Sequence, residues 1–230
     1  MIHCADLSLF KHLAGLVVIL SSRSTVPAMH VNKSDLDHLE KRYRTTFVNS
    51  LAGFRQAVLV GTRSNAGHTN LAIFNSLIHL GAQPSLFGLI SRPDSVPRDT
   101  LQNILETGSY TLNYVRAEKY RAAHQTSARY GKEESEFDKA GFAPLFYEGC
   151  SAPFVSEAVV QIAMQLEEVL PIKINGTSLI IGSIAHVIIP DAMVGSDGYI
   201  DLPAEEILIA QGLDAYCTAK PIGRLPYAKP

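Results

Sequence analysis

Short apolar runs rich in β-branched residues recur along the chain, and this pattern limits the folds that the chain can adopt. They occupy residues 57–61, 69–74, 86–90, 110–115, 158–167, 177–189 and 207–210. The first two runs flank an Asn- and Gly-containing loop at 62–68, which predicts a β-hairpin. Helical patterns interrupt the runs without the regular alternation that parallel α/β folds require. We therefore predict a mainly β protein with helical insertions and a barrel-like core.

Three helices are predicted from apolar spacing and polarity. Residues 34–44 carry apolar side chains three and four positions apart, and Ser34 suits the N-cap. Residues 118–129 and 134–139 also have helical patterns.

A fourth predicted helix has signals at both of its ends. Asp99 suits the N-cap, Gln102 stands three residues later, and Gly108 follows the last helical position. Within this helix we expect Ile104 and Leu105 to be buried.

The charge balance argues against a generic nucleic-acid binder. The 230 residues include 20 Lys and Arg against 22 Asp and Glu, a net charge of −2, whereas such binders show a basic excess. The cysteines, Cys4, Cys150 and Cys217, are odd in number and far apart, so they predict neither a disulfide framework nor a paired metal site. A reducing, cytoplasmic environment suits them, and no apolar run approaches the roughly 20 residues of a membrane span.

The first 28 residues differ from the rest and form a separate N-terminal extension. Residues 13–20 are apolar, as in the central region of a signal peptide. Asp6 stands where such a peptide is basic, and Pro27 lies beside the only small-residue cleavage position. We favour translation that begins at Met29, with a signal peptide as the alternative.

Self-contained catalytic motifs are missing from the sequence. It has no nucleophile elbow, phosphate-binding P-loop, dinucleotide fingerprint or zinc-protease motif, and its eight histidines do not cluster as metal ligands. Ser76 and His79 are three residues apart, but their segment favours strand and loop over a helix that would pair them. Cys150 lacks a basic helix start beside it, so we interpret it as a packing residue. An enzyme of this kind takes its chemistry from an organic cofactor.

Residues 91–103 suggest a phosphate site. Arg92, Ser95, Arg98 and Thr100 lie just before or within the first turn of the predicted Asp99 helix. A helix start offers unpaired backbone N–H groups and a partial positive charge, and arginine and hydroxyl side chains add donors. The alternative is an ordinary capped helix with two solvated arginines, and the neighbouring aspartates favour it.

Several motifs in order resemble a known family. They are TNLAIFNS at 69–76, Pro84, Arg92, RDT at 98–100, Asn103-Ile104, Gly108 and Asn113. Further similar segments are EKRYR at 40–44, NSLAGF at 49–54, AHQTS at 123–127 and PYA at 226–228. Over residues 33–230 the chain resembles the flavin-reductase-like FMN-binding split-barrel family, and more narrowly its flavoredoxin-like branch. It departs from many relatives in the segment AQPS at 82–85, where they carry a double proline and this chain has Pro84 alone.

The resemblance implies a split barrel that binds FMN. It assigns the isoalloxazine ring to Asn70, Ala72, Asn75 and Ser76, with Leu71 and Phe74 shaping an apolar wall. It assigns the ribityl phosphate to Arg98 and Thr100, with Arg92 and Ser95 in support.

The resemblance also implies an activity, in which NAD(P)H passes a hydride to the flavin in a homodimer. His124, Gln125 and Ser127 fall where an insertion of the family approaches the flavin or the second substrate, so His124 is a weak catalytic candidate. The alternative for His124 is a hydrogen-bonded structural histidine. Two other functions stay open, a non-catalytic flavin-binding electron carrier and a split-barrel protein that binds another ligand such as haem.

Overall fold

The computed structural model describes residues 28–93, 99–131 and 133–229. The chain divides into two compact units, residues 1–48 and 49–230. Helices α1 (Lys33–His38) and α2 (Lys41–Leu51) replace the single helix predicted at the N-terminal side. The cap of α1 is Asn32, whose side chain accepts from the Asp35 N–H while Asp35 accepts in return from the Asn32 N–H. This reciprocal pair satisfies two free donors, so Ser34 is not the cap.

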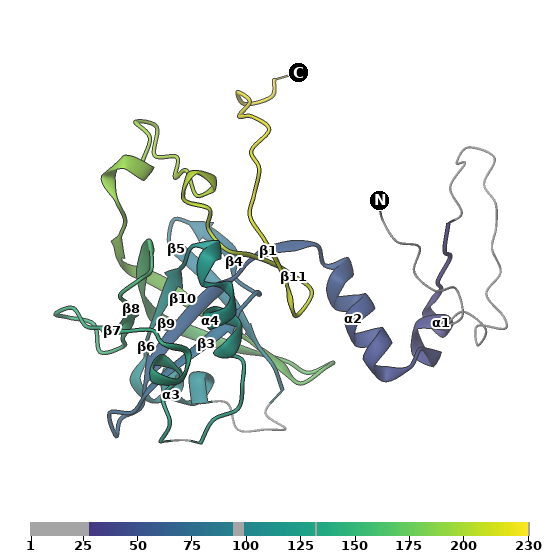
Figure 1. Ribbon diagram of the computed structural model, residues 1–230, viewed down its shortest axis with the longest axis horizontal. Coiled ribbons are helices and arrows are strands. Elements are labelled where there is room, and N and C mark those ends of the chain that lie inside the picture. The colour runs from purple at the N-terminus through teal and green to yellow at the C-terminus, as the bar shows by residue number, and fades with distance from the viewer. Residues whose placement is uncertain (1–27, 94–98, 132, 230) are drawn as a thin grey trace. The chain divides into compact units, whose positions relative to one another are not determined.

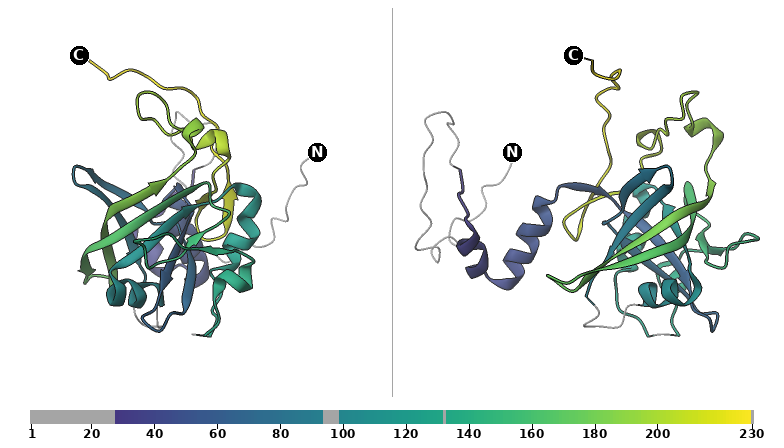
Figure 2. Two further views of the ribbon diagram at one scale, coloured as in Figure 1. Left: turned by 90° about the vertical axis from the view of Figure 1, so that its left-hand side faces the viewer. Right: turned by 180° about the vertical axis from the view of Figure 1, so that it is seen from behind.

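A seven-stranded antiparallel sheet forms the main part of residues 49–230 (Figure 1). Its strands are β2 (Val58–Arg63), β3 (Thr69–Phe74), β4 (Ile78–Ala82), β5 (Ser85–Ser91), β6 (Ser109–Tyr114), β9 (Val160–Ile172) and β10 (Thr177–Ile188). The order is β3-β2-β6-β9-β10-β5-β4, and β2 and β3 form the predicted hairpin. Ser76, just after β3, exchanges hydrogen bonds with the backbone of Ile90 on β5. The sheet therefore curls until strands near its two ends meet (Figure 2).

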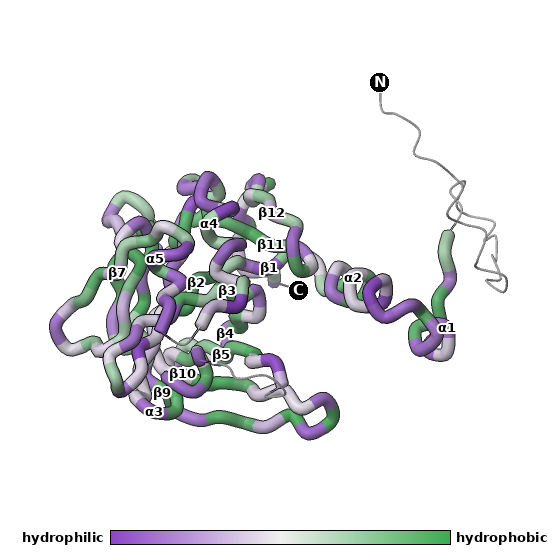
Figure 3. The backbone as a smooth tube through the Cα atoms, turned by 60° about the horizontal axis from the view of Figure 1, so that its bottom comes forward, coloured by the Kyte–Doolittle hydropathy of each residue, from purple (hydrophilic) through white to green (hydrophobic). Residues whose placement is uncertain are grey.

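Each face of β2 packs into its own apolar cluster. Val58 and Val60 belong to a first cluster inside the barrel, whereas Ala57 and Leu59 belong to a second cluster on the outer face. Successive side chains of a strand point to opposite faces, so a strand buried on both faces reads as a continuous apolar run. The apolar stretches of the backbone follow the strands of the sheet (Figure 3).

Helix α3 (Asp99–Thr107) packs into the first cluster through Leu101 and Ile104. Its end is as predicted, because Gly108 follows it with a φ of 67°, a left-handed conformation that suits glycine. The predicted burial of Leu105 is wrong: this side chain is 57 % exposed, and Leu101 is buried instead. Asp99 is the first helical residue and not the cap, and residue 98 lies outside the described residues.

The other helices are shorter than their sequence patterns. They are α4 (Tyr120–Gln125), preceded by the 3₁₀ turn η2 (Ala117–Lys119), and α5 (Glu136–Ala140), capped by Ser135. Two further 3₁₀ turns are η3 (Asp191–Met193) and η4 (Pro203–Glu205). None of the helices in the described part of the chain is long and apolar enough to cross a membrane.

Two small sheets complete the fold. One is ordered β1 (Phe54–Gln56), β11 (Ile209–Gln211), β12 (Ala215–Cys217), and the other pairs β7 (Pro144–Leu145) with β8 (Phe154–Val155). Because β1 runs directly into β2, the first small sheet continues the barrel wall next to the end of β3.

Candidate functional site

Strand β3 lies at one edge of the sheet, where it presents the predicted ring-binding segment. Leu71 has no exposed surface, and its side chain packs in the second cluster. Phe74 packs against the first cluster, on the opposite face. The two side chains therefore cannot form one apolar wall together, because residues three apart on a strand point to opposite faces. The Leu71 N–H donates to Glu136 Oε2 at 3.1 Å, so both the side chain and the N–H of Leu71 are engaged within the chain.

The residues that follow β3 are tied to neighbouring strands. Asn75 Nδ2 donates to the Gly212 carbonyl at 2.6 Å. The Ser76 hydroxyl donates to the Ile90 carbonyl at 3.1 Å and accepts from the Ile90 N–H at 3.2 Å. His79 packs its ring edge-on against Phe87 of β5 instead of against Ser76. These contacts fix the backbone of the segment.

A buried polar network joins β2, β3 and α3. Asn70 Nδ2 donates to Thr62 Oγ1 at 3.1 Å and to Thr100 Oγ1 at 3.0 Å, and Asn103 Nδ2 donates to Thr62 Oγ1 at 3.1 Å. All of these side chains are buried. The structure therefore brings two of the predicted site residues, Asn70 and Thr100, into direct contact, and adds Thr62 and Asn103 to them.

Of the other predicted phosphate ligands, Arg92 is the one that lies among the described residues. Arg92 is exposed just past the end of β5, and its guanidinium makes no hydrogen bond or ion pair with another described residue. Ser95 and Arg98 lie outside the described residues.

Two buried donors without partners stand next to the predicted ring segment. They are Arg55 Nε and Gln56 Nε2 on β1, and the third unpartnered side-chain atom buried in the described part of the chain is the Tyr110 hydroxyl. Strand β1 runs directly into β2, whose first residue, Val58, pairs with Phe74 at the end of β3. Buried donors are usually paired, so these two are suited to acceptors on a ligand. The sequence analysis missed them, although a polar Arg-Gln pair directly before an apolar strand was a visible signal.

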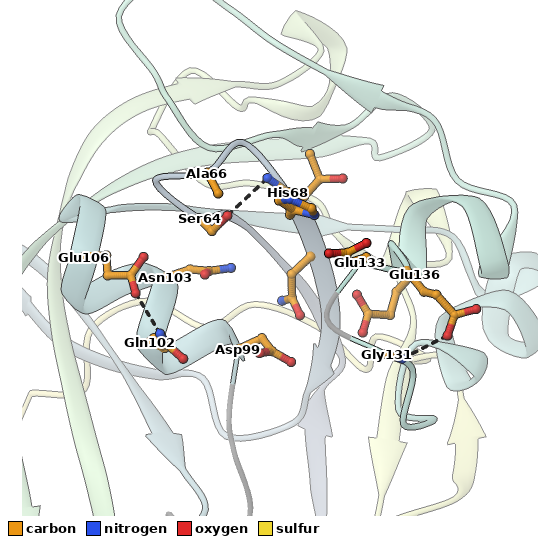
Figure 4. Close-up of a pocket in the computed structure, with 13 residues that line it drawn as sticks. Ser64, Ala66, His68, Asp99, Gln102, Asn103, Glu106, Gly131, Glu133 and Glu136 are labelled. Carbon is orange, nitrogen blue, oxygen red and sulfur yellow. Dashed lines mark hydrogen bonds between the residues drawn. The ribbon is translucent and has the colours of Figure 1, made fainter.

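A pocket of about 240 Å³ opens beside α3, and its lining is acidic (Figure 4). Asp99, Gln102, Asn103 and Glu106 of α3 face Glu133 and Glu136 across it. Burial raises the pKa of the Glu136 carboxyl, and the charge of Asp99 acts in the same direction. Because a phosphate dianion is repelled by such a lining, this pocket is a poor phosphate site. Thr100 does not line it.

The predicted residues of α4 make local contacts. His124 Nδ1 lies 2.9 Å from the Tyr216 hydroxyl, and the two rings meet edge to face. Gln125 Nε2 donates to the Tyr130 hydroxyl, and the Ser127 hydroxyl donates to the His124 carbonyl. His124 is therefore held in place by its contacts with β12. Among the described residues, no group of three or more His, Cys, Asp or Glu side chains could hold a metal ion.

Comparison with known proteins supports the fold and assigns a family. The family model of the flavin reductase like domain matches residues 52–201. A candidate flavin reductase with a split barrel domain from Shewanella frigidimarina NCIMB 400 is 47 % identical, with a TM-score of 0.84 over 87 % of this chain and 100 % of that one.

Two more distant structures share the fold. The flavoredoxin of Desulfovibrio vulgaris (Miyazaki F) is 20 % identical, with a TM-score of 0.65 over 76 % of this chain and 92 % of that one. An NADH:FAD oxidoreductase of Streptomyces globisporus is 14 % identical, with a TM-score of 0.64 over 85 % and 100 %. The predicted split-barrel architecture is confirmed, and the chain belongs to the flavin reductase-like family.

Proposed function

We propose that this flavin-linked oxidoreductase binds FMN and reduces it with NAD(P)H. Membership of the family supports a flavin cofactor. The observation that carries FMN in particular is the Thr100 hydroxyl in the first turn of α3. Because Asn70 Nδ2 can only donate, Thr100 Oγ1 is the acceptor in their hydrogen bond, and its own hydrogen has no acceptor among the described residues.

The phosphate end of the proposed site is built around the start of α3. The first backbone N–H groups of the helix have no intrahelical partner, and the helix dipole favours an anion there. Thr100 adds a hydroxyl donor, and Arg92 adds a guanidinium that no described carboxylate neutralises. Ser95 and Arg98 enter the proposal through the family resemblance alone.

The ring end of the proposed site follows the outer edge of β3 and its continuation. The Leu71 N–H points away from β2, so by alternation the N–H and C=O of Ile73 also face outward. Ala72 has a small side chain, and the backbone of Asn75 and Ser76 is fixed by the contacts described above. The unpartnered Gln56 donor on β1, the strand that leads into β2, suits the carbonyl oxygens at the polar edge of an isoalloxazine ring.

The chemistry of the reaction requires little from protein acids or bases. A bound flavin supplies a two-electron acceptor for the hydride of a nicotinamide. The chain's own groups contribute orientation, through the fixed β3 edge, and electrostatic stabilisation, through N–H donors that do not need to reorganise. We assign His124 to the approach of the second substrate, as a residue held by Tyr216 and not as a required acid.

We also propose a cytoplasmic homodimer with the flavin near the subunit interface. The described cysteines, Cys150 and Cys217, are free thiols, which suits a reducing compartment. The proposed dimer rests on the resemblance to the family. NADH is the nicotinamide to assay first, because the Streptomyces protein is an NADH:FAD oxidoreductase.

The test combines cofactor identification with steady-state kinetics. Cofactor released from the native protein should be FMN, and added FMN should support NADH or NADPH oxidation. Replacing Arg98 and Thr100 together by Ala should remove FMN retention from a protein that still folds, whereas Arg121→Ala on exposed α4 should retain it. Unchanged FMN affinity in the double variant would refute the phosphate assignment. A haem spectrum, or bound FMN that neither nicotinamide reduces, would refute the reductase function.

A further inference from the structure

We propose that Thr62, buried on β2, is a positioning residue that makes the protein distinguish FMN from riboflavin. It does so by holding α3 where the Thr100 hydroxyl can meet the phosphate. This inference rests on the proposed function and adds to it a residue that nothing else assigns to the site.

Thr62 is the point where the buried network converges. Its side chain has no exposed surface, and its Oγ1 accepts one hydrogen bond from Asn70 and one from Asn103, each at 3.1 Å. A carboxamide nitrogen can only donate, so both bonds require an acceptor at this position. Because Asn70 lies on β3 and Asn103 on α3, this one buried acceptor links the strand to the helix.

The network fixes α3 at two places along its axis. Asn103 is bonded to Thr62 directly, and Thr100, almost one turn earlier, is bonded to Thr62 through Asn70. Leu101, which lies between Thr100 and Asn103, and Ile104, which follows Asn103, pack in the first cluster. The apolar contacts hold the helix against the barrel, whereas the directional polar contacts determine its rotation and its position along β3.

The direction of the hydrogen bonds explains the consequence for a phosphate. Asn70 Nδ2 uses one hydrogen for Thr62 and the other for Thr100. Thr100 therefore accepts from Asn70, and its own hydrogen, which has no acceptor among the described residues, is the one we propose for the phosphate. If Thr62 is lost as an acceptor, Asn70 is free to turn, and the Thr100 hydroxyl loses the contact that orients it.

The position of Thr62 itself is closed to solvent, because its side chain has no exposed surface. Asn70 and Asn103 line the pocket beside α3, but their exposed fractions are only 9 % and 6 %. Removing the shared acceptor leaves two buried amide hydrogens without a partner, which costs enough to move the helix or its side chains. Asn70, which the resemblance assigns to the ring, has both amide hydrogens in this network instead. The ring end proposed above runs from Ala72 to Ser76 and includes no residue of the network, so riboflavin, which lacks the phosphate, should be affected much less.

The test compares dissociation constants for FMN and riboflavin, measured by flavin fluorescence on the full chain. Thr62→Val keeps the shape and removes the acceptor, and we expect FMN binding to weaken by about tenfold or more. Riboflavin binding should change by less than about twofold, a difference that a general loss of stability would not produce. Thr62→Ser restores the hydroxyl and should return most of the preference for FMN.

Thr111 provides a matched control. It is also fully buried on a strand, and its hydroxyl also accepts from an asparagine amide, Asn113 Nδ2, while donating to the Pro153 carbonyl. Thr111→Val should lose stability but keep the FMN preference, because Thr111 does not contact α3 through any hydrogen bond found in the described part of the chain.

The outcomes separate the inference from the proposed function. If the wild-type protein prefers FMN and Thr62→Val keeps that preference, the inference is wrong and the proposed function stands. If Thr62→Val weakens FMN and riboflavin equally, the residue has only a structural role and the inference is again wrong. If the wild-type protein binds both flavins equally, the phosphate assignment fails, and the inference fails with it.

Discussion

The packing of α3 into the barrel can be tested by removing one buried side chain from it. Ile104 has no exposed surface, whereas Leu105, its neighbour in the chain, is 57 % exposed. Ile104→Ala removes roughly three methylene-sized groups, and about 0.8 kcal/mol for each gives about 2.4 kcal/mol of lost transfer free energy. The cavity left among the core side chains adds to this loss, so the free energy of unfolding should fall by about 3–4 kcal/mol. Leu105→Ala should change it by less than about 0.5 kcal/mol.

The assay must suit a chain without tryptophan. Unfolding in urea is therefore followed by far-UV circular dichroism, and the midpoint and slope of each transition give the free energy of unfolding. Ile104→Ala should lower the midpoint at an unchanged slope, and it should also lower FMN retention, because the start of α3 depends on this packing. Equal losses for the two variants would show that the face of α3 assigned to the core is wrong.

Three further predictions concern buried groups. Tyr110→Phe removes a buried hydroxyl that has no partner, and it should raise the free energy of unfolding by about 1 kcal/mol in the same urea assay; a clear loss would show that the hydroxyl is paired. Burial raises the pKa of Glu136 above its usual 4.5, so the folded state binds this proton more tightly than the unfolded state does. The stability that this proton contributes is present below the unfolded pKa and is lost as the pH rises through the folded pKa. In thermal melts, the stability of the wild-type protein should decline as the pH rises above 4.5, and Glu136→Gln should lack this decline. An identical decline in both proteins would show that Glu136 does not cause it. Gly61→Ala would place a Cβ 2.2 Å from the Pro153 carbonyl oxygen and should cost about 3 kcal/mol, whereas Gly223→Ala, with no atom within 4 Å, should be neutral.

Local sequence signals predicted the elements whose pattern is strong and short in range. The β2–β3 hairpin needs only two apolar runs and a turn, and the run at 177–189 matches β10 almost residue for residue. The run at 158–167 predicted β9 but ended five residues before the strand does, because a pair of exposed glutamates interrupts the apolar pattern there. The end of α3 at Gly108 follows from the freedom of glycine at positive φ. The cap at Asn32 and the exposure of Leu105 were mispredicted, because several residues in each segment suit the same local role.

The candidate site was predicted in part. TNLAIFNS and the start of α3 were singled out together, and the structure joins them through the hydrogen bond between Asn70 and Thr100. Thr62 and Asn103 were not predicted to be site residues, since a polar side chain does not by itself show which partner it meets, and the Arg-Gln pair before β2 was not recognised as a signal. Their relevance depends on which strand lies beside which helix.

The amino-acid sequence by itself determined that this chain forms a mainly β barrel with a helix that ends at Gly108, because apolar runs, turn residues and helix ends act over a few neighbouring positions. Only the tertiary structure decided which side chains meet at that helix. The bonds from Thr62 to Asn70 and Asn103 span 8 and 41 residues, and the bond from Asn70 to Thr100 spans 30. Such contacts arise when the sheet curls and the helix packs into it, since burial then selects the polar groups that must pair with one another.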